Sequence, residues 1–73
     1  MAQEIIRHTP STNISQIVYD PETQVLVISF QKGGVCEYYD VDETSAHGFE
    51  QALSATKYMN AFIENIFPSQ RVG

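Results

Sequence analysis

Cysteine and positive charge are scarce in this chain. A single cysteine, Cys36, excludes a disulfide within the chain, and no paired cysteine and histidine spacing indicates structural zinc. No apolar run approaches the roughly 20 residues of a membrane helix, and residues 1–8 lack a signal-peptide core. A free cysteine without an export signal favours the cytosol. We therefore expect a cytoplasmic protein with no membrane partner.

The shortage of positive charge limits the class of ligand. Four Lys and Arg residues face nine Asp and Glu residues, a net charge of -5 at pH 7. Long nucleic acid is disfavoured, because its affinity comes from Lys and Arg side chains that displace counterions. A small anion held by a few local groups remains compatible with this charge. The simplest role of the acidic surface is solubility.

The chain has 73 residues, enough for one small domain. A lone core of this size supplies only about 3–5 kcal/mol of stability without help. The four Tyr and four Phe residues provide much of the area that can be buried. Because disulfides and zinc are excluded, we expect self-association to add stability, and the protein to be a homo-oligomer.

Three short apolar runs predict strands over residues 14–19, 25–31 and 35–39. Asp20-Pro21-Glu22-Thr23 is typical of a type I turn, and Lys32-Gly33-Gly34 of a glycine turn. Strands joined by such short turns form an antiparallel meander.

The apolar period then changes from two to about 3.6 residues. Asp42 is expected to cap a first helix, and Ser54 to break it and cap a second, which ends before Pro68. Gly48 weakens the first helix by about 1 kcal/mol relative to alanine. The expected inward positions are Ala46, Phe49, Ala52 and Leu53 in the first helix, and Tyr58, Met59, Phe62, Ile63, Ile66 and Phe67 in the second.

These elements predict an α+β fold: a three-stranded antiparallel β-meander followed by two short helices packed on one face. In this arrangement Phe62 and Ile63 should face the strand residues Leu26 and Phe30. The opposite face carries Val25, Val27 and Tyr39, which indicates either a dimer or partner surface or simple strand propensity.

Residues 1–10 form an N-terminal arm, residues 11–68 the domain, and residues 69–73 a C-terminal tail. The arm is expected to be either a strand added to the edge of a sheet or a frayed end. Its apolar pair, Ile5 and Ile6, favours docking onto this domain or onto a neighbouring copy.

One spaced set of residues extends over nearly the whole domain. It comprises Ile17-x-Tyr19-Asp20, Leu26-x-Ile28-x-Phe30, Gly34, Tyr38, Val41, Phe49, Ala52, Ser54 and Lys57-Tyr58-x-Asn60-x-x-Ile63. This set resembles the KTSC domain family, named for the C-terminal extension of certain lysyl-tRNA synthetases and also found as small free-standing proteins of bacteria and phages.

The resemblance implies a β-meander followed by helices and a role in RNA or nucleotide binding. It places the binding region at the start of the second helix, on Ser54, Lys57, Tyr58 and Asn60. Family members often carry basic residues along this helix and its tail, where this chain has Ala61, Glu64 and Asn65, with only Arg71 beyond Pro68. This replacement favours a small nucleotide-like ligand over RNA.

The remaining cations and candidate groups are few. Arg7 and Arg71 are added to the ligand-binding set, because an anion needs a positive partner, and in a dimer either arginine could complete the other copy's pocket. Three further groups are candidates. His8, Ser11 and Thr12 precede the first strand and are expected to approach a ligand from the side opposite the helices. Glu43, His47 and Glu50 have a spacing that favours a surface pair over a metal site. Cys36 is expected as a buried apolar residue on the face that carries Leu26 and Ile28, toward the helices, if Tyr38 also faces inward.

No nucleophile, base or metal ligands assemble into a catalytic set, so we expect no enzyme activity, cofactor or metal. The predicted function is a non-catalytic module for a nucleotide-like ligand, such as a phage or bacterial protein that sequesters a signalling nucleotide at an oligomer interface. Two alternatives remain open: a protein-interaction or oligomerisation module, and an RNA-binding accessory domain.

Overall fold

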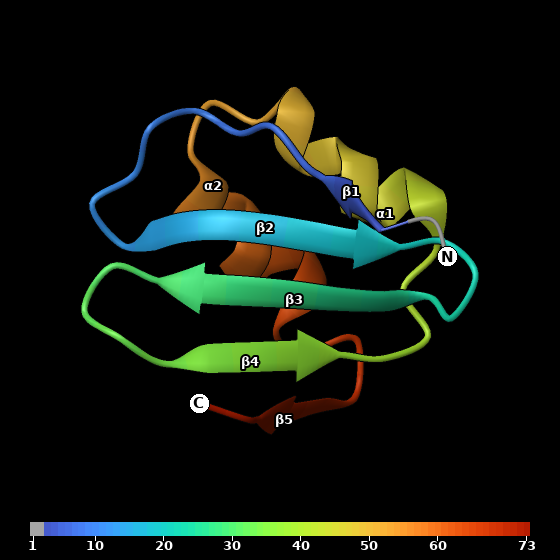
Figure 1. Ribbon diagram of the computed structural model, residues 1–73. Coiled ribbons are helices and arrows are strands. Elements are labelled where there is room, and N and C mark those ends of the chain that lie inside the picture. Colours follow the sequence, from blue (N-terminus) through green and yellow to red (C-terminus); the bar gives the residue numbers. More distant parts are fainter. Residues whose placement is uncertain (1–2) are drawn as a thin grey trace.

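The computed structural model describes residues 3–73. Its sheet has five antiparallel strands in the order β1-β2-β3-β4-β5 (Figure 1). The strands are β1 (Glu4–Ile5), β2 (Ile14–Asp20), β3 (Val25–Phe30), β4 (Val35–Tyr38) and β5 (Ser69–Arg71). The α+β class and the central meander are confirmed, but the prediction of three strands is wrong.

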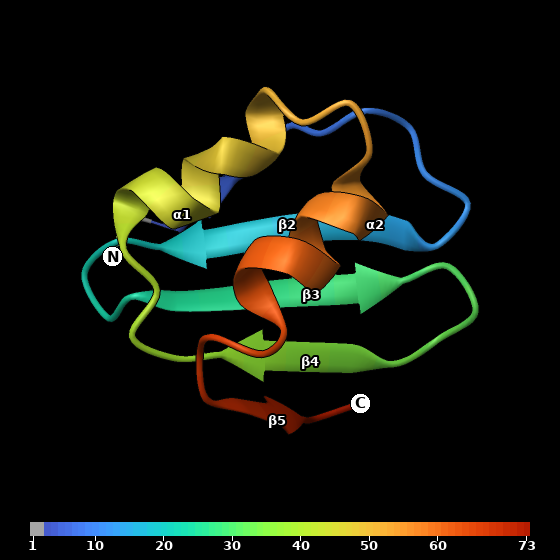
Figure 2. The same ribbon diagram turned by 180° about the vertical axis from the view of Figure 1, so that it is seen from behind.

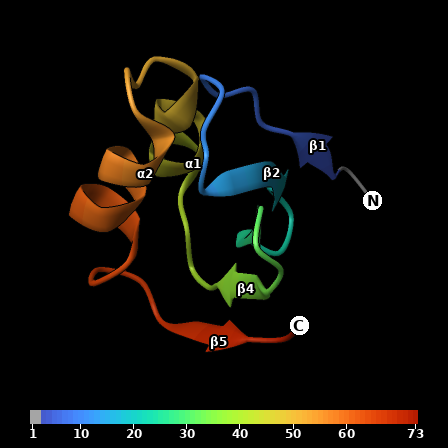
Figure 3. The same ribbon diagram turned by 90° about the vertical axis from the view of Figure 1, so that its left-hand side faces the viewer.

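The two unpredicted strands extend the edges of the sheet. β1 pairs with β2, with Glu4 opposite Tyr19, and β5 pairs with β4, with Gln70 opposite Glu37. Each is two or three residues long, too short to show an alternating apolar pattern. β1 and β5 are the two edge strands and lie at opposite ends of the curled sheet (Figure 3).

The helical layer covers one face of this sheet (Figure 2). α1 (Glu43–His47) runs into a 3-10 turn, η1 (Gly48–Glu50), and α2 (Ala55–Tyr58) runs into a π-helical turn, η2 (Met59–Ile63). Both predicted caps are confirmed: Ser45 N–H donates to the Asp42 carboxylate at 3.1 Å, and Lys57 N–H to the Ser54 hydroxyl at 3.3 Å. Among residues 3–73, no helix has the length and apolar character needed to cross a membrane.

The core lies between the sheet and the helices. Its fully buried members include Ile6, Ile14, Ile17, Tyr19, Leu26, Ile28, Val41, Phe49 and Ile63. The Tyr19 hydroxyl donates to the carbonyl of Val41 and so joins β2 to the loop before α1. The arm therefore contributes to this domain's own core through Ile6, whereas Ile5 is exposed.

Three residues expected in the core point outward instead. Leu53 is 96% exposed, Phe62 55% and Ile66 60%, whereas Ile63 is fully buried. In η2 the Glu64 N–H donates to the Met59 carbonyl, five residues back, at 2.8 Å. This wider turn keeps Met59 and Ile63 inward and rotates Phe62 away from the sheet. The prediction that Phe62 faces the strands is wrong, and the one for Ile63 is correct.

Candidate functional site

Two adjacent hollows share the residues Leu53, Ser54 and Lys57 at the start of α2. The first, of about 460 Å³, is lined by Pro10–Asn13 and Leu53–Lys57. The second, of about 470 Å³, is lined by Ala52, Leu53, Ser54, Lys57, Tyr58, Ala61 and Phe62. Lys57 is the one charged residue among the described residues that line either hollow. We refer to the two hollows together as the Lys57 site.

The first hollow is the more polar of the two, although more than half of its lining surface is apolar, and it is organised by Ser11. The Ser11 hydroxyl accepts the backbone N–H groups of Asn13 and Ile14, at 3.0 and 3.1 Å, and lies 3.3 Å from the Thr56 hydroxyl. Nearby, the Thr9 hydroxyl donates to the carbonyl of Ala52 at 3.1 Å. These contacts tie the loop before β2 to the start of α2 and fix the two walls of the hollow.

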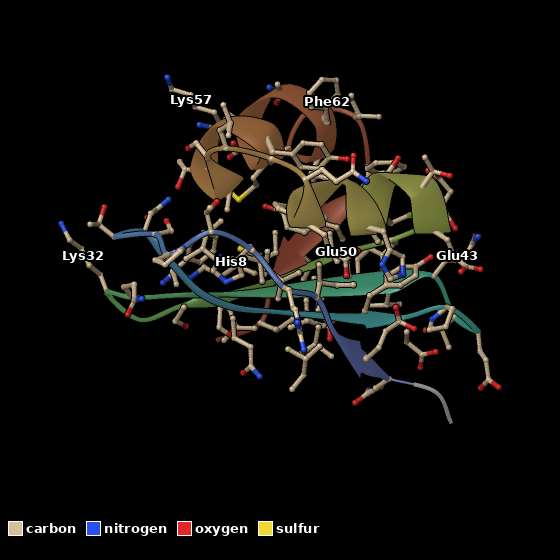
Figure 4. All side chains as sticks on the ribbon, turned by 90° about the horizontal axis from the view of Figure 1, so that it is seen from above. His8, Lys32, Glu43, Glu50, Lys57 and Phe62 are labelled. Atoms are coloured by element: carbon tan, nitrogen blue, oxygen red, sulfur yellow. The ribbon has the colours of Figure 1, made fainter. Side chains whose placement is uncertain are left out.

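The second hollow is apolar. The rings of Tyr58 and Phe62 lie 5.0 Å apart with an interplanar angle of 35°, and the exposed side chain of Leu53 stands beside them. Phe62 and Lys57 both project from the outer side of the helical layer, away from the sheet (Figure 4). The hollow therefore offers a partly aromatic surface to solvent within reach of an ammonium group.

Tyr58 has a structural role as well as a place in this site. Its hydroxyl donates to the Ser45 carbonyl at 2.7 Å, and its ring packs edge-on against Phe49 at 4.7 Å. Burial, and secondarily the charge of Asp42, raise the pKa of Tyr58. The hydroxyl thus stays a protonated donor engaged within the protein, and only the ring is available to a ligand.

The other predicted site residues do not join this group. Asn60 is exposed and lines neither hollow. Arg7 lines a third hollow, of about 560 Å³, between the arm and β2, together with His8. Arg71, on β5, has its guanidinium group over Gly34, and its Nε donates to the Gly73 carbonyl at 3.1 Å. Strands β2, β3 and β4 separate the two arginines, a span of about 15–20 Å at the usual strand spacing.

Of the polar residues before β2, Ser11 and Thr12 lie beside Lys57, on the helical side of the sheet rather than opposite the helices. The sequence interpretation missed Leu53 and Phe62, because an amphipathic pattern assigns every apolar residue of a short helix to the core. The Ser54 cap directly after Leu53 was the available signal, since residues just before a cap lie outside the helical pattern.

His47 at the end of α1 forms surface pairs with Glu4 of β1 and Glu50 of η1. The Nε2 atom of His47 lies 2.6 Å from the Glu4 carboxylate, and its Nδ1 atom 3.4 Å from the Glu50 carboxylate. The two ring nitrogens point in different directions, so these groups do not converge on one ion. Within residues 3–73, no three His, Cys, Asp or Glu side chains are placed to hold a metal.

Cys36 packs against the core from β4, opposite Ile28, and is half-buried. Its predicted orientation toward the helices is confirmed, although its burial is only partial. No charged or basic side chain is found hydrogen-bonded to its sulfur among the described residues, which is the setting of a packing residue.

Comparison with known proteins agrees with this architecture. The KTSC domain model matches residues 10–67. A lysine–tRNA ligase of Nostoc punctiforme is 32% identical over 59 residues, which are 81% of this chain and 10% of that protein. The crystal structure of a KTSC domain protein from Yersinia pestis superposes with a TM-score of 0.86 at 28% identity, covering 99% of this chain and 100% of that one. The chain spans about a tenth of the length of the ligase and belongs to the KTSC domain family.

Proposed function

We propose that this chain is a non-catalytic module that binds a small nucleotide-like ligand at the Lys57 site. One observation carries the proposal: Lys57 stands at the junction of two hollows, one lined by several hydroxyl side chains and the other almost wholly apolar. A nucleotide has the matching pair of properties, a flat base that stacks on aromatic surface and an anionic phosphate. The base would lie against Tyr58 and Phe62, with the phosphate at the ammonium group.

The chemistry of the lining supports binding without turnover. The residues that line the two hollows include no histidine, cysteine, aspartate or glutamate. General acid–base and nucleophilic catalysis most often use such groups. The Ser11 and Ser54 hydroxyls in the lining accept backbone N–H groups, and no carboxylate or imidazole among the described residues of the lining is available to activate them. Sequestration of a signalling nucleotide in the cytosol of a bacterium or an infected cell is the role that such a module would suit.

Self-association enters the proposal through the arginines. Arg7 and Arg71 line neither hollow of this chain, and we propose that an arginine of a neighbouring copy completes the Lys57 site. In that oligomeric version the ligand sits at an interface. Measurement of the mass in solution at micromolar concentration tests it, and a monomer in the presence and absence of nucleotide would exclude it.

An RNA-binding accessory function is the second candidate, because one relative of the chain is a lysine–tRNA ligase. The single lysine in the site and the net charge of -5 argue against a long RNA, whose affinity depends on many phosphate contacts. Strong RNA binding with a steep salt dependence would favour this candidate over the small ligand.

A nuclear magnetic resonance titration of the full chain with adenine, guanine and uracil mononucleotides tests the proposal. We expect saturable shifts of the backbone amides of Thr12, Asn13, Leu53, Lys57 and Phe62, which line the Lys57 site. Shifts centred on the arm hollow beside Arg7, or no shifts with any nucleotide, would contradict it.

A further inference from the structure

The charge inside the Lys57 site limits how much negative charge its ligand can carry. Thirteen residues line the two hollows. Lys57 alone among them is ionic, and it is exposed. The site thus presents one positive charge to a ligand, with hydroxyl groups and apolar side chains around it.

We propose that the ligand of the Lys57 site carries a single phosphodiester charge, as in a cyclic mononucleotide or a dinucleotide linkage, and that di- and triphosphates gain nothing by their extra charges. This inference rests on the proposed function and specifies its ligand class. Each further phosphate charge would find no cation in the site, and it would meet the net negative field of the protein.

The nearest alternative cations are held elsewhere. Lys32 projects from the β3–β4 turn at one end of the sheet, apart from the helical layer that carries Lys57 (Figure 4). Arg7 lies in the arm hollow, and Arg71 is folded over Gly34. Among the described residues no arginine lines either hollow, so the Lys57 site lacks the arginine fork that usually holds a more highly charged phosphate.

The hydroxyl groups around the site suit a weakly charged ligand. Ser11 accepts two backbone N–H groups, so its own proton and that of Thr56 are shared between the two hydroxyls or offered outward. Such neutral donors contribute to binding a phosphodiester oxygen or a ribose hydroxyl, but they bring no positive charge to offset a second or third phosphate charge.

A series of adenine ligands that differ in charge tests the inference by calorimetry on the full chain. Adenosine, 3′,5′-cyclic AMP, AMP and ATP carry none, one, about two and about four negative charges. We expect cyclic AMP to bind roughly tenfold more tightly than adenosine, a difference of about 1.4 kcal/mol, and at least as tightly as ATP. Tenfold tighter binding of ATP would overturn the inference and leave the proposed function standing.

Failure of the function itself gives a different result. If none of the four ligands binds, and neither do their guanine and uracil counterparts, the proposed function fails and the charge inference with it. A base preference among these series changes neither conclusion, because the comparison of charges is made within one base.

A substitution that adds a cation makes the test reciprocal. Thr12 is exposed and lines the first hollow, so Thr12→Lys places a second ammonium in the site. We expect this variant to bind ATP roughly tenfold more tightly and to leave cyclic AMP nearly unchanged. Thr23→Lys, at an exposed position of the β2–β3 turn, changes the net charge equally and is the matched control. Equal effects of the two variants on ATP would overturn the inference, because they would show that net charge rather than the site limits the ligand.

Discussion

The hydroxyl of Tyr58 occupies the space that a side chain at Gly48 would need. A β-carbon built on Gly48 would lie 1.9 Å from the Tyr58 hydroxyl oxygen and 2.4 Å from the ring carbon that bears it. Gly48 has an ordinary helical φ of -58°, so conformation alone does not require glycine here. The absence of a side chain at this position lets α2 approach α1 closely enough for the hydrogen bond from Tyr58 to the Ser45 carbonyl.

Gly48→Ala therefore separates two opposing effects. Helix propensity alone would stabilise the variant by about 1 kcal/mol, whereas the forced displacement of the Tyr58 ring should cost about 1–3 kcal/mol. We expect net destabilisation in urea unfolding. The same substitution in a Tyr58→Leu background should cost less or become stabilising. A stabilised Gly48→Ala single variant would contradict the observed packing.

Adjacent residues in η2 provide a second test. Ile63 is fully buried, so Ile63→Ala should lower the free energy of unfolding by about 2–5 kcal/mol. Phe62 is mostly exposed and loses mainly its ring contact with Tyr58, so Phe62→Ala should cost at most about 1.5 kcal/mol. Equal losses for the two variants would show that the π-helical turn does not rotate Phe62 outward.

The cap of α1 should make stability depend on pH. Hydrogen bonds from the hydroxyl and backbone N–H of Ser45 lower the pKa of Asp42. A carboxyl group with a depressed pKa in the folded state contributes stability above its unfolded pKa of about 3.9, and this contribution is lost as the pH falls through the folded value.

Thermal or urea unfolding between pH 6 and pH 2 measures this loss. Asp42→Asn keeps a helix cap that does not titrate and is the reference. Below about pH 4, and not above it, the native chain should lose stability relative to this variant. At neutral pH, Asp42→Ala should cost about 0.5–2 kcal/mol. A constant difference between the native chain and Asp42→Asn over the whole range would contradict a contribution from the carboxylate.

Truncation after Pro68 tests the edge strand β5. Val35 N–H donates to the Gly73 carbonyl at 3.1 Å, a bond that truncation removes. Tyr39 N–H donates to the Pro68 carbonyl at 2.8 Å, a bond that is kept. Hydrogen exchange should become faster at Val35 and change little at Tyr39. Unchanged protection at both positions would show that β5 does not pair with β4 in solution.

The central part of the fold follows from short-range signals. The three middle strands are short apolar runs between turn sequences, and the two helices begin at Asp42 and Ser54, whose side chains accept backbone N–H groups. These features depend on a few neighbouring residues and can be recognised without knowledge of the tertiary structure.

The edges of the sheet and the outer face of α2 could not be predicted in this way. β1 and β5 exist because long-range pairing with β2 and β4 satisfies their backbones, which no local pattern of two or three residues encodes. Phe62 follows the apolar spacing of a core residue, and only the π-helical turn moves it to the surface. Helical periodicity assumes a regular helix and cannot anticipate that turn.

The candidate site was predicted in part. Ser54, Lys57 and the ring of Tyr58 lie together as expected, but Asn60 lies outside the two hollows and the arginines are at distant edges. Spatial proximity of cations depends on strand order, and the unpredicted edge strands place Arg7 and Arg71 at opposite ends of the sheet.

The most direct test of the Lys57 site compares two lysine variants by calorimetry with the tightest-binding mononucleotide. Lys57→Gln and Lys32→Gln remove the same charge from exposed positions, but only Lys57 lines the two hollows. Lys57→Gln removes the charged partner of the phosphate and should weaken binding by roughly 10- to 100-fold. Lys32→Gln removes a charge outside the site and should weaken binding by less than about twofold. Equal affinities of the two variants would contradict a binding site centred on Lys57.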